Sequence, residues 1–247
     1  MKINIMLSYL RNCKFRHYII TRTYCTEILR EQPKEFVTSA IGDINFIDFH
    51  STWKNDEEEA LRKQVLEHMR VIPDFISEAE ENSLLAEVEP QLKRMRYEFD
   101  HWDNAIQGYR ETERGSWSEA NSSTLARVRA AAFPPGAALL PHVHVLDLAA
   151  AGHIRPHVDA VRFCGDTIAG LCLLSTAVMR LTHEERPHIA FDALLQRRCL
   201  YIMSGAARYS FKHAVLGNED STWCGRRVQR LRRVAVICRE APPAHAA

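Results

Sequence analysis

The chain has 247 residues, 46% apolar and 26% charged, which suits one globular domain with an extension. Its formal net charge is only +1, so no overall basic field argues for a nucleic-acid partner, and DNA is not expected. The longest weakly charged apolar stretch, residues 167–179, is too short to cross a bilayer, so we expect no membrane span.

The first 26 residues differ from the rest because they carry cations without counter-charges. No acidic residue precedes Glu27, and apolar residues are interspersed with the cations Lys2, Arg11, Lys14, Arg16 and Arg22. Such a sequence is typical of a mitochondrial transit peptide, which we predict at residues 1–26. A disordered basic tail is the alternative. Residues 27–65 have mixed character, and we interpret them as a linker or a poorly ordered approach to the domain.

A first helix is predicted where a capping signal precedes apolar residues at helical spacing. Ser77 is followed three positions later by Glu80, which is the pattern of a capping box. The helix should run from about residue 78 towards residue 94, and Pro90 within it indicates an end or a kink. Residues 96–102 then alternate well enough to be interpreted as a strand.

The remainder of the chain favours short strands after one more helix. The second helix is predicted over residues 123–132, before a Pro-Pro-Gly sequence. Strands are predicted at residues 142–148, 153–159, 168–174, 178–182, 198–203, 208–213 and 233–238. We therefore expect a mainly β (α+β) domain at residues 66–240, a barrel or jelly roll with the two helices outside, and a tail at 241–247.

Three side chains form a candidate metal site. His157 and Asp159 are two residues apart, so on an extended chain they point to the same side. His213 lies 54 residues beyond Asp159 and can reach the same point only from another strand. Two imidazoles and one carboxylate are the ligands of non-haem iron(II) with open coordination positions.

Other interpretations of these residues stay open. A His-x-Asp sequence is common by chance, and His142, His144 and His153 are rival candidates that can equally be surface or core histidines. Zinc is the other metal that these residues could bind, although the cysteines lack zinc-ligand spacing.

A pair of arginines follows the candidate metal site. Arg233 and Arg239 stand six residues apart on a predicted strand, so they share a face at a Cα separation of about 20 Å, given a rise of ~3.3 Å per residue. Arginine binds carboxylates in a bidentate manner, so the pair can bracket a small dicarboxylate, and the Tyr201 hydroxyl can add a donor. The alternative is that both arginines are solvated strand ends.

Between residues 71 and 239 the sequence resembles the AlkB family of iron(II)- and 2-oxoglutarate-dependent dioxygenases, and within it a mitochondrial member. The segments that carry the resemblance are residues 96–102, 110–113, 117–119, 144–148, 156–159, 163–165, 167–171 and 208–209. The resemblance implies a double-stranded β-helix and O₂ as a further co-substrate. It implies Fe(2+) at His157, Asp159 and His213, with no catalytic side chain beyond these ligands. For 2-oxoglutarate it implies a site formed by Tyr201, Arg233 and Arg239 with the backbone around Val234 and Ala235.

The resemblance also bears on location and substrate. It implies that the protein is located in the mitochondrial matrix. It also implies roles in fatty-acid metabolism and programmed necrosis. Members that repair nucleic acids carry a lid over a flipped base, but only about 40 residues separate Trp102 from His142 here, and they include a helix. We therefore expect hydroxylation of a protein side chain. The alternatives are a demethylase of mitochondrial RNA, with the arginines of residues 226–233 on phosphate, and a non-catalytic binding module in cell-death signalling.

Overall fold

The computed structural model describes residues 42–53, 58–99 and 104–243. The chain divides into two compact units, Met1–Glu35 and Phe36–Ala247, and every described residue belongs to the second. The predicted transit peptide lies outside the described residues, as do residues 100–102 of the predicted strand at 96–102 and most of the tail.

The second unit is built mainly from strands. In chain order its elements are η1 (Ile44–Phe46), β1 (Ile47–Phe49), α2 (Glu59–His68), β2 (Met69–Ile72), α3 (Glu78–Leu92), β3 (Ile106–Arg114), α4 (Glu119–Ala132), β4 (Val143–His157), β5 (Ile168–Leu173), β6 (Ala177–His183), β7 (Ala190–Leu195), β8 (Leu200–Met203), α5 (Gly205–Tyr209), β9 (Phe211–Val215), β10 (Thr222–Trp223), β11 (Arg226–Arg227) and β12 (Arg233–Arg239).

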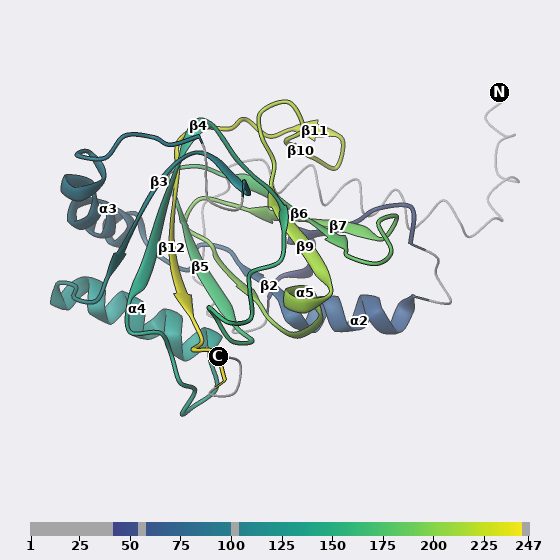
Figure 1. The fold of residues 1–247 in the computed structure, drawn as a ribbon, viewed down its shortest axis with the longest axis horizontal. Helices are drawn as coiled ribbons and strands as arrows, with labels where there is room; N and C mark the ends of the chain where they lie inside the picture. The colour runs from purple at the N-terminus through teal and green to yellow at the C-terminus, as the bar shows by residue number, and fades with distance from the viewer. Residues whose placement is uncertain (1–41, 54–57, 100–103, 244–247) are drawn as a thin grey trace, which may run out of the picture. The chain divides into compact units, whose positions relative to one another are not determined.

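Ten of the strands form one curled sheet. Its order is β1-β7-β6-β9-β4-β12-β5-β8-β2, with β3 paired to β4 beside this path, and β10 and β11 form a separate pair. The strand pairs are antiparallel. In Figure 1 the sheet bends around β12, drawn in yellow, with α3 and α4 on one side of it. The predicted mainly β fold of jelly-roll type, with its two early helices outside, is confirmed.

The hydrophobic core lies between these helices and the sheet. Leu84 and Val88 of α3 and Leu125 and Val128 of α4 belong to one buried cluster with Val145, Leu171, Val234 and Val236 of the strands. Because side chains alternate along a strand, every second residue of β12 enters this core. The residues between them, Arg233, Ile237 and Arg239, line a cavity on the other face of the sheet. The alternation therefore separates the core from the candidate site.

The start of α3 confirms the predicted capping box. The backbone N–H of Glu80 donates to Ser77 Oγ at 3.2 Å, and the backbone N–H of Ser77 donates to Glu80 Oε2 at 2.8 Å. The helix continues through Pro90 and ends two residues later at Leu92. Pro90 lacks the N–H that would donate to the carbonyl of Ala86, so the last turns of the helix lose one hydrogen bond.

Replacing Ser77 with alanine should lower the free energy of unfolding by about 1 kcal/mol, because the first turn of α3 loses its side-chain acceptor. Urea denaturation measures the change. The matched control is Ser83→Ala in the interior of the same helix, which should be neutral or slightly stabilising, since alanine has the higher helix propensity. Equal losses in both variants would contradict a capping role.

Several predicted boundaries are wrong, and the reasons are local. The helix predicted from residue 123 begins at Glu119, because Ser118 caps it by accepting from the backbone N–H of Asn121 at 3.4 Å. The strand predicted at 208–213 is instead the short helix α5 followed by β9. Of the strand predicted at 96–102, the described part makes only a bridge between Glu98 and Tyr109.

Other elements went unpredicted. Strands β2, β3 and β7 carry no clear polar–apolar alternation, since β7 is buried along its whole length and β3 is rich in charged residues. In the described part of residues 27–65 the structure places η1, β1 and the first residues of α2. The folded unit thus reaches further towards the N terminus than residue 66.

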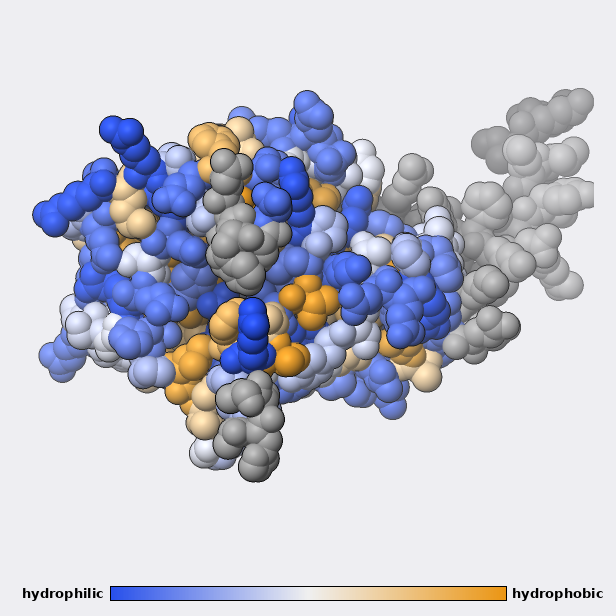
Figure 2. Space-filling view, viewed as in Figure 1, coloured by the Kyte–Doolittle hydropathy of each residue, from blue (hydrophilic) through white to orange (hydrophobic). Residues whose placement is uncertain are grey.

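The surface in Figure 2 is mostly hydrophilic, with apolar residues in small groups. Across the part of the chain that the structure describes, no helix combines the length and apolarity needed to span a membrane.

Candidate functional site

The strand register brings the three candidate ligands together. His157 is the last residue of β4, and His213 lies in the middle of β9 directly opposite it in the β4–β9 pairing. The centroids of the two imidazole rings are 4.3 Å apart. Asp159 follows two residues after His157, beyond the end of β4. One ladder pair and one short extension therefore assemble all three side chains.

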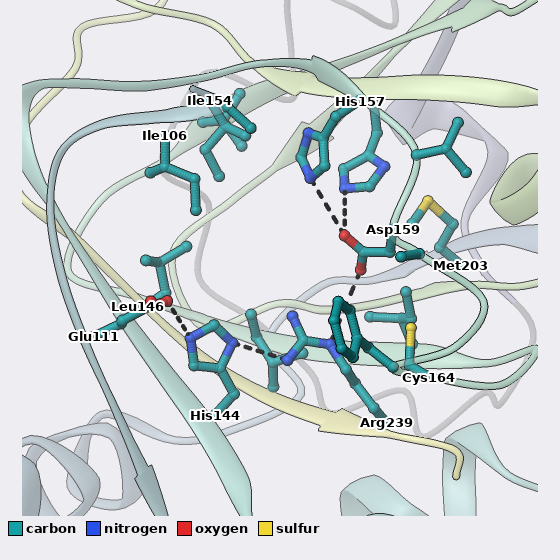
Figure 3. Close-up of a pocket in the computed structure, with 18 of the residues that line it drawn as sticks. Ile106, Glu111, His144, Leu146, Ile154, His157, Asp159, Cys164, Met203 and Arg239 are labelled. Carbon is teal, nitrogen blue, oxygen red and sulfur yellow. Dashed lines mark hydrogen bonds and ion pairs between the residues drawn. The ribbon is translucent and has the colours of Figure 1, made fainter. Parts of the chain in front are cut away.

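The ligand atoms of these residues face one point. Asp159 Oδ1 lies 3.3 Å from His157 Nε2 and 3.9 Å from His213 Nε2. One ligand atom of each residue lies within 4.8 Å of those of the other two. These separations suit side chains that share a cation at about 2 Å from each atom. Figure 3 shows the His157 ring directed at the Asp159 carboxylate, with their interaction marked by a dashed line.

The protonation of the three groups also suits a metal. His157 Nδ1 lies 2.9 Å from the carbonyl oxygen of Arg155, so Nδ1–H can donate there and leave Nε2 to bind. Burial and the nearby His157 together lower the pKa of His213 to about 4, so its ring is neutral at pH 7. Burial raises the pKa of Asp159, but the hydrogen bond with His157, the charge that His213 carries in acid and the charge of Arg239 outweigh it. The carboxyl pKa therefore stays below its usual range.

An ionised carboxylate and two imidazole nitrogens form the donor set of a divalent transition-metal site. The residues therefore fit iron(II) by the chemistry of their donors as well as by distance. In the described ranges, His142, His144 and His153 belong to no such group.

A cavity of about 1040 Å³ opens beside the three ligands. Its polar wall includes Tyr201, Arg233 and Arg239. An apolar part is formed by Ile106, Leu146, Ile154, Met179 and Val215. In Figure 3, Ile106 and Ile154 lie near His157, and Arg239 lies on the opposite side of the Asp159 carboxylate. The cavity thus offers a charged region and an apolar region on two sides of the metal ligands.

Arg233 is a buried cation with an incomplete set of acceptors. Its side chain is almost wholly buried, and its Nη2 donates to Cys172 Sγ at 3.2 Å. Its buried Nε has no hydrogen-bond acceptor among the described residues. A guanidinium in this state is costly unless an anion pairs with it, so the geometry calls for an anionic ligand. Arg233 is therefore no solvated strand end.

The Tyr201 ring has space in the sheet because of the residue opposite it. Burial raises the pKa of Tyr201, so its hydroxyl keeps its proton and can donate. Gly170 of β5 faces Tyr201 directly in the β5–β8 ladder. A methyl group at Gly170 would overlap the tyrosine ring and lie 2.6 Å from its hydroxyl oxygen. Only glycine at residue 170 leaves room for the tyrosine ring at its observed position.

Two residues of the implied 2-oxoglutarate site do not reach the cavity. Val234 and Ala235 are absent from its wall, and Val234 belongs to the core beneath the helices. Both lie in the interior of the sheet, where β12 pairs with β4 and β5. The expectation that their backbone borders the 2-oxoglutarate site therefore stays a prediction.

Sequence reasoning missed the partners of Arg239. His144 appears there only as a rival metal ligand, and Glu111 lies on a strand that was not predicted. In the structure Arg239 Nη1 lies 2.9 Å from His144 Nδ1, and His144 Nε2 lies 2.8 Å from Glu111 Oε2. The even spacing of His144 and Leu146 along β4, both facing the cavity, was the available signal.

The arginines of residues 226–233 do not form one basic surface. Arg226 and Arg227 are exposed, but Arg230 and Arg233 are buried. Arg232 is bound to Asp147 and Glu89. The predicted phosphate-binding cluster therefore reduces to two exposed side chains.

No protein-family model matches the chain. Over 190 residues it is 51% identical to the α-ketoglutarate-dependent dioxygenase alkB homolog 7, mitochondrial, of Bos taurus, and 50% identical to the protein of that name in Mus musculus. Each alignment covers 77% of this chain and 86% of the relative. Among solved structures, OsALKBH1 superposes with a TM-score of 0.53 at 13% identity, covering 70% of this chain and 98% of that one. The last similarity concerns the fold alone.

Proposed function

Because this chain belongs to the AlkB family of α-ketoglutarate-dependent dioxygenases, we propose that its iron(II) is held by His157, Asp159 and His213. The observation that carries this assignment is the convergence of their three ligand atoms within 4.8 Å, at the wall of a cavity that also contains a buried arginine. When bound, iron(II) with O₂ supplies the oxidation that converts 2-oxoglutarate to succinate and CO₂ and hydroxylates a C–H bond.

The remaining residues of the site bind and orient the co-substrate. Arg233 pairs with one carboxylate of 2-oxoglutarate in a buried setting, where a charge-assisted bond is strong. The Tyr201 hydroxyl donates to the same end, since it stays protonated. Arg239 lies nearer the metal ligands, with Nε 3.9 Å from Asp159 Oδ2, and contributes positive charge there. The buried walls exclude water from this region.

Replacing Arg233 with methionine should weaken 2-oxoglutarate binding by about 2–5 kcal/mol, at least ~30-fold, because the co-substrate carboxylate loses its buried partner. Calorimetric titration of 2-oxoglutarate into iron(II)-loaded protein without oxygen measures the change. Arg227→Met, on the exposed strand β11, is the matched control and should bind as the wild type does. Unchanged affinity in Arg233→Met would remove this residue from the site.

For the substrate, the proposal is a protein side chain. Within residues 104–142, β3 and α4 take up more than half of the chain, which leaves little room among them for a full lid over a base. The apolar region beside the metal ligands, with Ile106, Leu146 and Ile154, suits an aliphatic group presented by a peptide. An RNA substrate has weaker support, since only Arg226 and Arg227 of the basic cluster are exposed. A non-catalytic module would not need the complete donor set.

We also place the protein in mitochondria, as the names of its relatives state for them, and more narrowly in the matrix. The links to fatty-acid metabolism and programmed necrosis are part of the same proposal. They are tested by comparing fatty-acid oxidation and survival after alkylation in cells with wild-type protein and with a variant that lacks turnover.

One experiment separates the substrate classes. Iron(II)-loaded protein is incubated with 2-oxoglutarate and either the protein or the RNA fraction of mitochondria, and succinate formation is measured. Mass spectrometry then identifies products that gain one oxygen. We expect the protein fraction to stimulate turnover and to contain the oxidised product. Stimulation by RNA alone, with loss of a methyl group, would favour the demethylase.

A further inference from the structure

Three side chains form a diagonal line across the cavity face of the sheet. β4 lies between β3 and β12, and His144 on β4 is directly opposite Glu113 on one side and Ile237 on the other. Glu111 and Arg239 are each two residues from those direct partners, so both point to the same face as His144. Figure 3 shows the resulting continuous line from Glu111 through His144 to Arg239.

The chemistry of the line fixes the position of each proton. A guanidinium can only donate, so Arg239 Nη1–H donates to His144 Nδ1 at 2.9 Å. In a neutral imidazole the other nitrogen then carries the proton, and Nε2–H donates to Glu111 Oε2 at 2.8 Å. The carboxylate thus selects the tautomer of His144 that accepts from Arg239, as an outer partner does for a metal-bound histidine.

Arg239 has a second acceptor nearby. Its Nε lies 3.9 Å from Asp159 Oδ2, and Asp159 is one of the assigned iron ligands. Without a competing acceptor, the guanidinium would be attracted to that carboxylate alone. A close Arg239–Asp159 pair would engage a ligand oxygen and turn the arginine away from the co-substrate region.

We propose that Glu111 and His144 are positioning residues for 2-oxoglutarate, which hold the Arg239 guanidinium beside the metal centre and away from close pairing with Asp159. This inference rests on the proposed function. It assigns the two residues no contact with the reacting atoms. The Arg239 side chain has many rotamers. Because His144 already holds it in one of them, less conformational entropy is lost when the co-substrate binds.

The line is suited to mutation because it lies outside the helix-side core. The side chains are 36% exposed for Glu111, 13% for His144 and 22% for Arg239, and all three line the cavity. Substitutions at Glu111 or His144 should therefore leave the melting temperature nearly unchanged.

The test compares acceptors at defined positions. His144→Asn can present its amide oxygen near the place of Nδ1, whereas His144→Leu has a similar volume and no acceptor. We expect His144→Leu to weaken 2-oxoglutarate binding by about 10–100-fold and His144→Asn by about threefold or less. Binding is measured by calorimetry on iron(II)-loaded protein without oxygen. At saturating 2-oxoglutarate, kcat should change by less than about twofold, because the chemistry itself is untouched.

A parallel pair tests the other end of the line. Glu111→Gln keeps an acceptor for His144 Nε2–H, and Glu111→Leu removes it, so the glutamine variant should bind 2-oxoglutarate more tightly than the leucine variant. Nitrogen-15 NMR of the metal-free protein adds a readout that involves no turnover. The His144 signals should show an unprotonated Nδ1, and His144→Asn identifies them by their loss.

Each outcome decides one question. If the wild-type protein does not bind 2-oxoglutarate, the proposed function fails. If it binds and His144→Leu binds equally well, the positioning role alone fails. Equal losses in the asparagine and leucine variants, a fall in kcat without a change in affinity, or a protonated Nδ1 would each overturn the inference as well.

Discussion

Asp159→Ala is expected to reduce succinate formation from 2-oxoglutarate to background. The substitution removes the only carboxylate of the donor set, and with it the negative charge between His157 and His213. The loss should exceed the ~10–100-fold effect of removing a mere outer partner of a metal ligand. Turnover is measured as succinate formed by protein incubated with iron(II), 2-oxoglutarate and O₂.

Metal-dependent stability separates loss of the site from loss of the fold. Iron(II) or manganese(II) that binds only the folded state raises the melting temperature of the wild-type protein. This increase should disappear in Asp159→Ala, while the metal-free melting temperature moves little. The control Glu219→Ala, an exposed carboxylate outside the cavity, should keep both turnover and the metal-induced increase. Retained turnover in Asp159→Ala would remove the ligand assignment.

Asp147→Ala is expected to produce the largest loss of stability, about 3–5 kcal/mol, by removing one partner of a buried ionic network. The Asp147 side chain is fully buried on the helix side of β4. It accepts from Arg110 Nε at 2.7 Å and from Arg232 Nη2 at 2.7 Å, and the Tyr97 hydroxyl donates to it at 3.2 Å. Arg232 also contacts Glu89 of α3. The network therefore joins β3, β4, α3 and the segment before β12.

Urea denaturation with comparison of three proteins measures this effect. Asp147→Asn keeps the size and one acceptor oxygen but not the charge, so its free energy of unfolding should fall between those of wild type and Asp147→Ala. Arg226→Ala, on the exposed strand β11, should stay within about 0.5 kcal/mol of wild type. A loss below about 1 kcal/mol in Asp147→Ala would mean that its partners find other acceptors.

The parts of the site that depend on local spacing could be predicted from the sequence. His157 and Asp159 share a side because they are two residues apart. Arg233 and Arg239 line the cavity together because side chains alternate along a strand and these two residues are an even number of positions apart. His213 and Tyr201 could be named as candidates on other predicted strands, but periodicity alone does not tell which strands become neighbours.

What the sequence could not supply depends on register and on burial. The partnership of Glu111 with His144 exists because β3 pairs with β4 in one alignment, and β3 was itself not predicted. The arginines of residues 226–233 look alike in the sequence. Their environments in the structure differ, because Asp147 and Glu89 bind Arg232 and the sheet buries Arg233.

The pairing of Gly170 with Tyr201 limits how this site can change over evolutionary time. The tyrosine ring fills the space that any side chain at residue 170 would need. A lineage that acquires alanine there therefore shifts the hydroxyl that we propose as a donor to 2-oxoglutarate, although no residue of the proposed binding site has changed. The two positions should vary jointly among descendants, with a larger residue at 170 tolerated only where 201 has become small.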